Sequence, residues 1–426
     1  SCDCSLPARE GEPTVGYWVG KPYWGKGICT EALRLMITHI RNTTDIKSLI
    51  SGHFISNPAS GRVMEKCGFL PTGETAFDNK LYQGADKPIR VLRLIKKKKY
   101  YILRMRILFA LLFTVCSLSA FEAKAQETGG KEKWVAAGRQ VINYLVDKHV
   151  DYNVIYDARD FGLPTPDSLH LKTADGFGIF AYEICPEHPK GVVICLSGIE
   201  NPSVTAFYGH AAEFYKADVA TIMPDLRGHG KSDGNRICLA YEETRDVKAV
   251  TDYIKSNAKY KDVPVIVMGV SMGAAVAIRS ICENKDIDGL ISLSAFSSLE
   301  DFLQASREAF LPMIPATELD GVTRHVVKEK YGVDASVSSP VYALRGLDNR
   351  PVLMMHSRKD TQVPYSCFEK LSAEASKYTI DLDTMTVEGD EHFICKDFIH
   401  PSSDREYMRR VMRFIRKLTS NHPYVK

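Results

Sequence analysis

The sequence predicts an α/β fold over its second part, with a mostly parallel sheet that helices cover on both faces. Two observations lead to this fold class. Short apolar runs, rich in β-branched residues, alternate with helical patterns from residue 191 to residue 419. One of these runs, residues 265–268, passes through Gly269-Val270-Ser271-Met272-Gly273 into an alanine-rich helical pattern. Strand, sharp turn and helix in this order form the context in which a Gly-x-Ser-x-Gly serine becomes a candidate nucleophile.

Length and composition limit the possibilities. A chain of 426 residues predicts two or three domains. Hydrophobic residues make up 45% of the chain and charged residues 25%, as in soluble globular proteins. The formal net charge of +3 is near neutral for this length and predicts no nucleic-acid partner. The 11 cysteines form no CxxC pair and no zinc-type spacing with histidine, so no metal site is expected.

Residues 1–97 predict a small α/β segment. We expect strands at 14–20 and 48–56, a helix at 28–41, and a second helix that Asn57 caps and that ends near Cys67. A glycine-containing loop at residues 21–27 precedes the first helix. Backbone N–H groups at such a loop-to-helix junction can hold a pyrophosphate.

The ordered motifs of this segment resemble the ribosomal-protein N-acetyltransferase branch of the GNAT superfamily. They are Gly16-Tyr17-Trp18, Trp24 to Ala32, Asn57-Pro58-Ala59-Ser60 and Met64 to Phe69. The resemblance covers the second half of a GNAT domain, and we expect a partial GNAT-like fragment. It implies that Gly25, Lys26, Gly27 and Ile28 would hold acetyl-CoA phosphates and that Asn57 would lie near this cofactor, if the segment is functional.

Residues 98–125 predict an export signal. Lysines 96–99 come first, followed by an apolar stretch within residues 103–121 and an Ala-x-Ala end at residues 123–125. The stretch is short for a bilayer span, and we expect cleavage after Ala125 and a secreted or periplasmic protein. Met105 stands where a start would be expected, so residues 105–426 could form a complete precursor. Left uncleaved, residues 103–121 would anchor the chain in a membrane.

Residues 126–426 predict one α/β domain. A hairpin turn at Asp175-Gly176 joins its first two strands, and an insertion at about 297–349 is expected to form a cap. We expect strands at 169–172, 177–184, 191–196, 217–224, 264–269, 289–293, 352–356 and 382–387, and helices at 133–149, 240–257, 272–284, 322–331, 365–377 and 403–419.

The motifs of this domain resemble the α/β-hydrolase superfamily, near the monoacylglycerol lipases and serine aminopeptidases. They are Ser197 to Asn201, Asp225 to Ser232, Gly269 to Gly273, Asp360 with Val363-Pro364, and Glu391-His392. The resemblance implies an α/β-hydrolase fold with a short helical cap, no cofactor, and a serine hydrolase. The first loop usually reads His-Gly in this family and is Ser197-Gly198 here.

Chemistry assigns a role to each candidate residue. Ser271 needs a base within hydrogen-bond reach, and His392 follows the last strand on a loop that can return over the turn. The imidazole needs an acid, for which Asp360 is preferred over Asp383 and Asp390. We expect the backbone N–H groups of Ile199 and Met272 to hold the oxyanion.

The expected reaction is cleavage of a carboxylic ester, with a small ester or acyl compound as substrate. A peptidase or a thioesterase of the same fold remains possible, as does a bifunctional chain with acetyl-CoA-dependent N-acetyltransferase activity. The apolar residues of the insertion could face an acyl chain or simply cover the sheet.

Overall fold

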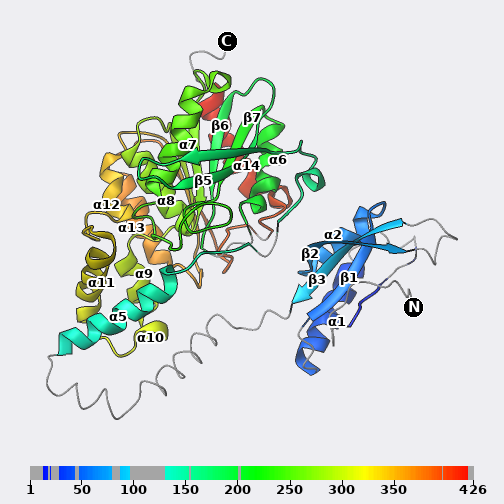
Figure 1. Ribbon diagram of the computed structural model, residues 1–426, viewed down its shortest axis with the longest axis horizontal. Helices are drawn as coiled ribbons and strands as arrows, with labels where there is room; N and C mark the ends of the chain where they lie inside the picture. Colours follow the sequence, from blue (N-terminus) through cyan, green and yellow to red (C-terminus); the bar gives the residue numbers. More distant parts are fainter. Residues whose placement is uncertain are drawn as a thin grey trace. The chain divides into compact units, whose positions relative to one another are not determined.

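The computed structural model describes residues 13–17, 20, 28–43, 48–78, 87–95, 130–152, 155–199, 203–395 and 397–420. The chain divides into two compact units, Ser1–Met105 and Arg106–Lys426 (Figure 1). The predicted export segment at 98–125 lies outside the described residues.

In the first unit, two helices pack on a three-stranded antiparallel sheet of order β1-β3-β2. Leu33 and Ile37 of α1 and Met64 of α2 are buried in one cluster with Leu92 of β3. Of the strand expected at 14–20, the described residues show a bridge between Thr14 and Ile50. The elements are α1 (Ile28–Thr43), β1 (Ser48–Phe54), α2 (Pro58–Lys66), β2 (Leu70–Asp78) and β3 (Lys87–Ile95).

The second unit is built on an eight-stranded sheet of order β11-β10-β9-β8-β6-β7-β5-β4. β4 and β5 pair antiparallel, as do β5 and β7, and the remaining neighbours are parallel. The strands are β4 (Asp167–Lys172), β5 (Gly178–Ile184), β6 (Gly191–Leu196), β7 (Val219–Pro224), β8 (Val265–Val270), β9 (Gly289–Leu293), β10 (Val352–Ser357) and β11 (Leu382–Val387).

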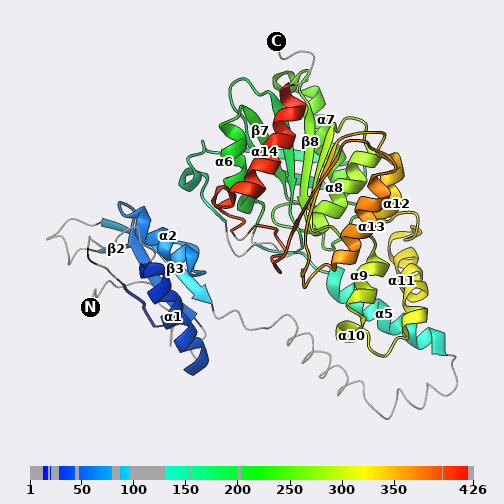
Figure 2. The same cartoon turned by 180° about the vertical axis from the view of Figure 1, so that it is seen from behind.

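Helices cover both faces of this sheet (Figures 1 and 2). Val265 and Val267 of β8 are buried in one hydrophobic cluster, whereas Ile266 and Met268 are buried in the other, as a strand covered on both faces requires. Residues of α7, α8 and α13 belong to the first cluster, and residues of α6 and α14 to the second. These helices are α6 (Tyr208–Tyr215), α7 (Thr244–Ser256), α8 (Met272–Glu283), α13 (Tyr365–Ala375) and α14 (Arg405–Ser420).

Several boundaries differ from the sequence prediction by a few residues, and two differences have a clear physical cause. α7 begins at Thr244 rather than near residue 240, because Leu239 and Ala240 have positive φ angles of 51° and 74°, which a right-handed helix excludes. α6 was not expected: nearly all of its residues are buried, so its sequence lacks the amphipathic pattern of a surface helix.

The insertion after β9 forms helices, which are α9 (Leu299–Ala305), α10 (Arg307–Phe310), α11 (Ala316–Tyr331) and α12 (Pro340–Ala343). Leu303, Leu311 and Ile314 are buried in the same core as α8, so these apolar side chains cover the fold. α5 (Gly130–Val146) joins this layer, since a Cβ atom on its Gly138 would lie 2.4 Å from Val322 Cγ1 of α11. Short 3₁₀ helices are η2 (Ala158–Phe161), η3 (Val204–Phe207), η4 (Ala258–Tyr260), η5 (Leu344–Gly346) and η6 (Pro401–Ser403).

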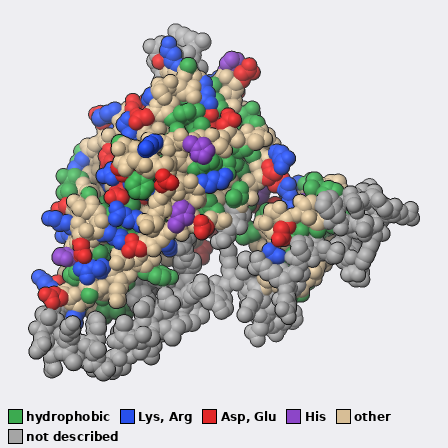
Figure 3. All heavy atoms as spheres, viewed as in Figure 1, with side chains coloured by type: hydrophobic (Ala, Val, Ile, Leu, Met, Phe, Trp, Pro, Cys, Tyr) green, Lys and Arg blue, Asp and Glu red, His purple; other side chains and the backbone are tan. Residues whose placement is uncertain are grey.

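Basic and acidic side chains are interspersed over the visible face of the second unit (Figure 3). Among the helices that the structure describes, none is both long enough and apolar enough to span a bilayer.

Candidate active site

The site is organised around Ser271, which stands between β8 and α8. Its φ of 56° and ψ of −121° belong to a sparsely populated backbone region that costs a non-glycine residue about 1–3 kcal/mol. The surrounding packing enforces this turn. A Cβ atom on Gly269 would lie 2.1 Å from the Gly273 carbonyl oxygen, and one on Gly273 would lie 2.2 Å from the Leu196 carbonyl oxygen. Both glycines are therefore required for the close approach of strand and helix.

The loop after β6 lies directly against this turn. A Cβ atom on Gly198 would be 3.0 Å from Ser271 Cβ and 3.5 Å from Ser271 Oγ. Met272 is the first residue of α8, where a backbone N–H has no helical acceptor. Ile199 follows Gly198 in the loop beside Ser271, and Glu200 and Asn201 lie outside the described residues. A helix start and a loop that meet at a serine hydroxyl form a place where negative charge can be stabilised.

Asp360 and His392 form a buried pair. His392 Nδ1 donates a hydrogen bond of 2.7 Å to Asp360 Oδ2, and only 6% of His392 and 9% of Asp360 is exposed. Asp360 Oδ1 accepts bonds of 2.8 and 3.0 Å from the backbone N–H groups of Gln362 and Val363. Burial would raise the pKa of Asp360, but the His392 bond and these two backbone bonds outweigh it, so its pKa lies below the ordinary value. The carboxylate stays ionised and fixes which imidazole nitrogen carries the proton.

The two rival carboxylates lie elsewhere. Asp383 is bound to Arg410 at 2.7 Å and to Arg413 at 2.5 Å, both on α14. Asp390 is exposed. The structure therefore pairs Asp360, rather than either rival, with His392.

The structure brings Gly198 to Ser271 and Asp360 to His392. Within the described residues no direct hydrogen bond joins Ser271 Oγ to His392 Nε2.

His356 and Ser357, at the end of β10, also reach this region. The place of His356 at the end of a core strand predicts a buried residue with its hydrogen bonds satisfied, whereas Ser357 was assigned no role. His356 Nε2 lies 3.0 Å from the Val363 carbonyl oxygen and 3.7 Å from Asp360 Oδ2. Burial lowers the pKa of His356, so its imidazole is neutral and donates to the carbonyl. The sequence does place both residues at the end of a strand, with His356 four residues and Ser357 three residues before the candidate acid Asp360.

The loop after β7 is held by buried polar contacts. Arg227 is 1% exposed and is paired with Asp246 at 2.7 Å and with Asp175 at 2.9 Å. His229 is buried, with Nδ1 3.1 Å from the Arg227 carbonyl oxygen, which is a structural contact.

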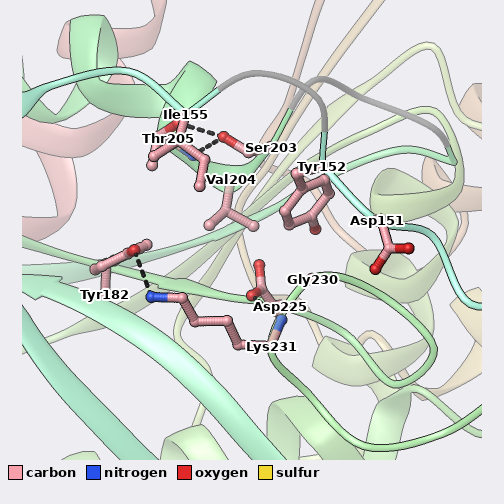
Figure 4. A pocket seen from close by; sticks show the side chains of 10 residues that line it. All are labelled: Asp151, Tyr152, Ile155, Tyr182, Ser203, Val204, Thr205, Asp225, Gly230 and Lys231. Carbon is pink, nitrogen blue, oxygen red and sulfur yellow. Dashed lines mark hydrogen bonds between the residues drawn. The ribbon is translucent and has the colours of Figure 1, made fainter. Parts of the chain in front are cut away.

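A pocket of about 160 Å³ lies beside this loop (Figure 4). Asp225 and Tyr152 point toward each other at one side of it, and Lys231 Nζ donates to the Tyr182 hydroxyl at 3.1 Å on the other. The residues that line it are Asp151, Tyr152, Ile155, Tyr182, Ser203, Val204, Thr205, Asp225, Gly230 and Lys231, so it is separate from the residues of the Ser271 turn.

In the first unit, Gly25, Lys26 and Gly27 lie outside the described residues. Ile28 begins α1 and is exposed. Asn57 caps α2, with Oδ1 accepting from the Ser60 N–H at 3.4 Å. Acetyl-CoA binding by these residues stays a prediction. Across the described ranges, no group of His, Cys, Asp and Glu side chains could hold a metal ion.

Each unit is similar to a known family of proteins. Residues 187–330 match the family model of the serine aminopeptidases, S33, and residues 2–70 match that of the acetyltransferase (GNAT) domain. A solved esterase of Pyrococcus furiosus superposes with a TM-score of 0.51 at 20% identity, covering 64% of this chain and 99% of that one. The second unit has the α/β-hydrolase fold, and the predicted fold class is confirmed. The chain therefore carries a segment that matches the GNAT family model and, after it, a domain with the α/β-hydrolase fold.

Curated relatives cover parts of the chain. The uncharacterized protein YqkD of Bacillus subtilis is 25% identical over 53% of this chain and 76% of its own length. Mouse monoglyceride lipase is 30% identical over 31% of this chain and 44% of its own length. Escherichia coli ribosomal-protein-serine acetyltransferase is 26% identical over 18% of this chain and 45% of its own length. The chain thus spans less than half of the lipase and of the acetyltransferase.

Proposed function

We propose that the second unit is a serine hydrolase that cleaves carboxylic esters through an acyl-enzyme intermediate. The observation that carries this proposal is the strained Ser271 beside Gly198, in a domain that also holds the buried His392–Asp360 pair. The named relatives include esterase, lipase and aminopeptidase, which supports a hydrolase of this fold and leaves the bond that it cleaves to be tested.

The mechanism follows from the roles of the groups. Ser271 Oγ attacks the ester carbonyl carbon while its proton passes to His392 Nε2, and the carbonyl oxygen becomes an oxyanion that accepts from the N–H groups of Met272 and Ile199. The tetrahedral adduct collapses, the C–O bond to the alcohol breaks, and the imidazolium returns its proton to the alcohol. Water then attacks the acyl-Ser271 carbonyl with the same proton transfers and releases the acid. Asp360 holds the Nδ1 proton and stabilises the imidazolium in both steps.

A substrate panel tests this proposal. The full chain is assayed with p-nitrophenyl esters of increasing acyl length, with matched anilides and with acyl thioesters. We expect ester turnover that exceeds anilide turnover and that Ser271→Ala abolishes. Faster cleavage of aminoacyl anilides would favour the peptidase, and faster thioester cleavage the thioesterase. Normal ester turnover by Ser271→Ala would refute a serine mechanism.

We also propose that residues 98–125 direct export, with cleavage after Ala125. A basic start, a short apolar run and an Ala-x-Ala end support this assignment. In a bacterial host, the exported protein should begin at Gln126. N-terminal sequencing that finds an uncleaved segment in the exported fraction would contradict cleavage and favour an anchor.

A further inference from the structure

Two tight turns carry the acid and the base of the candidate site. In the first, the Asp360 N–H donates to the Ser357 carbonyl oxygen at 3.2 Å. In the second, the Ile394 N–H donates to the Glu391 carbonyl oxygen at 3.0 Å, and Ile394 has a φ of 68°. His392 follows Glu391 in this second turn. The relative placement of the two turns therefore decides where the imidazole lies.

Ser357, the last residue of β10, contacts both turns. Its carbonyl oxygen closes the Asp360 turn, and its hydroxyl donates to the Glu391 carbonyl oxygen at 2.5 Å. Ser357 is completely buried, so bulk water cannot take the place of the hydroxyl. A hydroxyl deleted here leaves the Glu391 carbonyl with one donor fewer in a site that is shielded from solvent.

Besides the His392–Asp360 bond, backbone bonds join these two segments in the described part of the chain, and they end at Gly389. The Arg358 N–H donates to the Val387 carbonyl at 2.8 Å, and the Lys359 N–H donates to the Gly389 carbonyl at 3.1 Å. These backbone bonds continue the β10–β11 ladder to Gly389. The Ser357 hydroxyl is the side-chain bond that extends this attachment to the residue next to the base.

We propose that Ser357 is a positioning residue, whose hydroxyl holds the His392 turn in register with the Asp360 turn. The proposal rests on the serine hydrolase function proposed above. A displacement of about 1 Å in a reacting group can lower the rate roughly a hundredfold. The single bond from the Ser357 hydroxyl to the Glu391 carbonyl can therefore have a large effect on kcat. Ser357 does not touch the reacting atoms and acts through His392.

The experiment compares variants of the full chain. Ser357→Ala deletes the hydroxyl. Ser357→Thr and Ser357→Val form a volume-matched pair that differs in the hydroxyl alone. Ser280→Ala is the control, because Ser280 is a buried serine on α8 whose hydroxyl has no hydrogen-bond partner within the described chain. The readouts are kcat and KM for a p-nitrophenyl ester, the unfolding midpoint, and the downfield proton resonance of His392 Nδ1–H, assigned by its loss in His392→Gln.

We expect Ser357→Ala and Ser357→Val to lower kcat about ten- to hundredfold with KM within about twofold, and to weaken or broaden the Nδ1–H resonance. Ser357→Thr should restore kcat and the resonance relative to Ser357→Val, and Ser280→Ala should leave both as in the wild type. Wild-type kcat and resonance in Ser357→Ala would overturn the proposal. Equal losses of kcat in Ser357→Thr and Ser357→Val would also overturn it. So would losses of kcat that parallel the fall in the unfolding midpoint.

The resonance separates this proposal from the proposed function. A wild-type chain without ester turnover would refute the function, whereas the Nδ1–H signal would still report whether the Ser357 hydroxyl orders the pair. An unchanged signal in Ser357→Ala would then overturn the positioning role alone.

Discussion

Asp360 Oδ2 accepts a hydrogen bond of 2.7 Å from His392 Nδ1, although 32 positions separate the two residues in the chain. The parallel arrangement of β10 and β11 produces this contact, because the chain leaves both strands at the same edge of the sheet. Both side chains are buried, so the pair is screened little by solvent.

The first prediction concerns the acid. Asp360→Asn should lower kcat by about 10³–10⁴-fold, because the amide removes the charge that favours the imidazolium and can select the wrong tautomer. Asp383→Asn is the matched control, since Asp383 pairs with arginines of α14 and such partly exposed pairs contribute about 0–1 kcal/mol. Ester turnover of the two variants is compared at equal folded fraction. A large loss in Asp383→Asn with normal turnover in Asp360→Asn would show that the acid is misassigned.

The second prediction concerns the backbone around Ser271. Gly273→Ala should destabilise the protein by about 1–3 kcal/mol or prevent folding, because its Cβ would stand 2.2 Å from the Leu196 carbonyl oxygen. Gly321→Ala is the counterpart within α11, where a Cβ meets nothing within 4 Å. That variant should gain about 0.5–1 kcal/mol, the usual difference between glycine and alanine in a helix. Chemical denaturation measures both, and equal effects would contradict the packing argument.

The third prediction concerns Glu243, which is completely buried at the start of α7. Burial and the neighbouring Asp246 raise its pKa to about 7, and Oε1 accepts from the Cys238 N–H at 2.7 Å. The unfolded carboxyl titrates near 4.5, so the native state binds the extra proton. This group stabilises the fold most below about pH 4.5, and its contribution is lost as the pH rises through about 7.

Glu243→Gln should therefore gain stability relative to the wild type as the pH rises from 5 to 8, by up to about 3 kcal/mol. Denaturant unfolding at several pH values measures this difference. Glu242→Gln is the control of opposite sign. Burial alone would raise the pKa of Glu242, but its hydrogen bonds with Cys238 and Arg236 outweigh burial, so its pKa lies below the ordinary value. A difference between Glu243→Gln and the wild type that does not change with pH would contradict the assignment.

The strands of the second unit were predicted well because each buried strand is a short, almost purely apolar run. β6 and β9, whose residues are all buried, have the predicted bounds. The contact of α5 with the cap could not be predicted. The approach of Gly138 to Val322 joins positions far apart in the chain, and neither residue carries a local signal of it.

In the candidate site, too, local features could be predicted from the sequence and contacts between distant segments could not. The Gly-x-Ser-x-Gly motif predicts its own geometry, because the strand, the turn and the helix follow one another directly in the sequence. His356 and Ser357, in contrast, look like ordinary strand residues in the sequence. Their contacts with Val363 and Glu391 exist only once the loops after β10 and β11 are folded together. Residues 200–202 and 25–27 are outside the described ranges, so the expectations for them stay predictions.

The central claim is that Ser271 is a nucleophile activated by His392, and covalent labelling tests it most directly. The full chain is treated with a fluorophosphonate, which reacts with an activated serine by forming a P–O bond and releasing fluoride, and the modified peptide is identified by mass spectrometry. We predict one label, on Ser271, which Ser271→Ala abolishes and His392→Ala slows by at least about a hundredfold. Labelling at another residue, or no labelling of a folded chain that hydrolyses esters, would contradict the account.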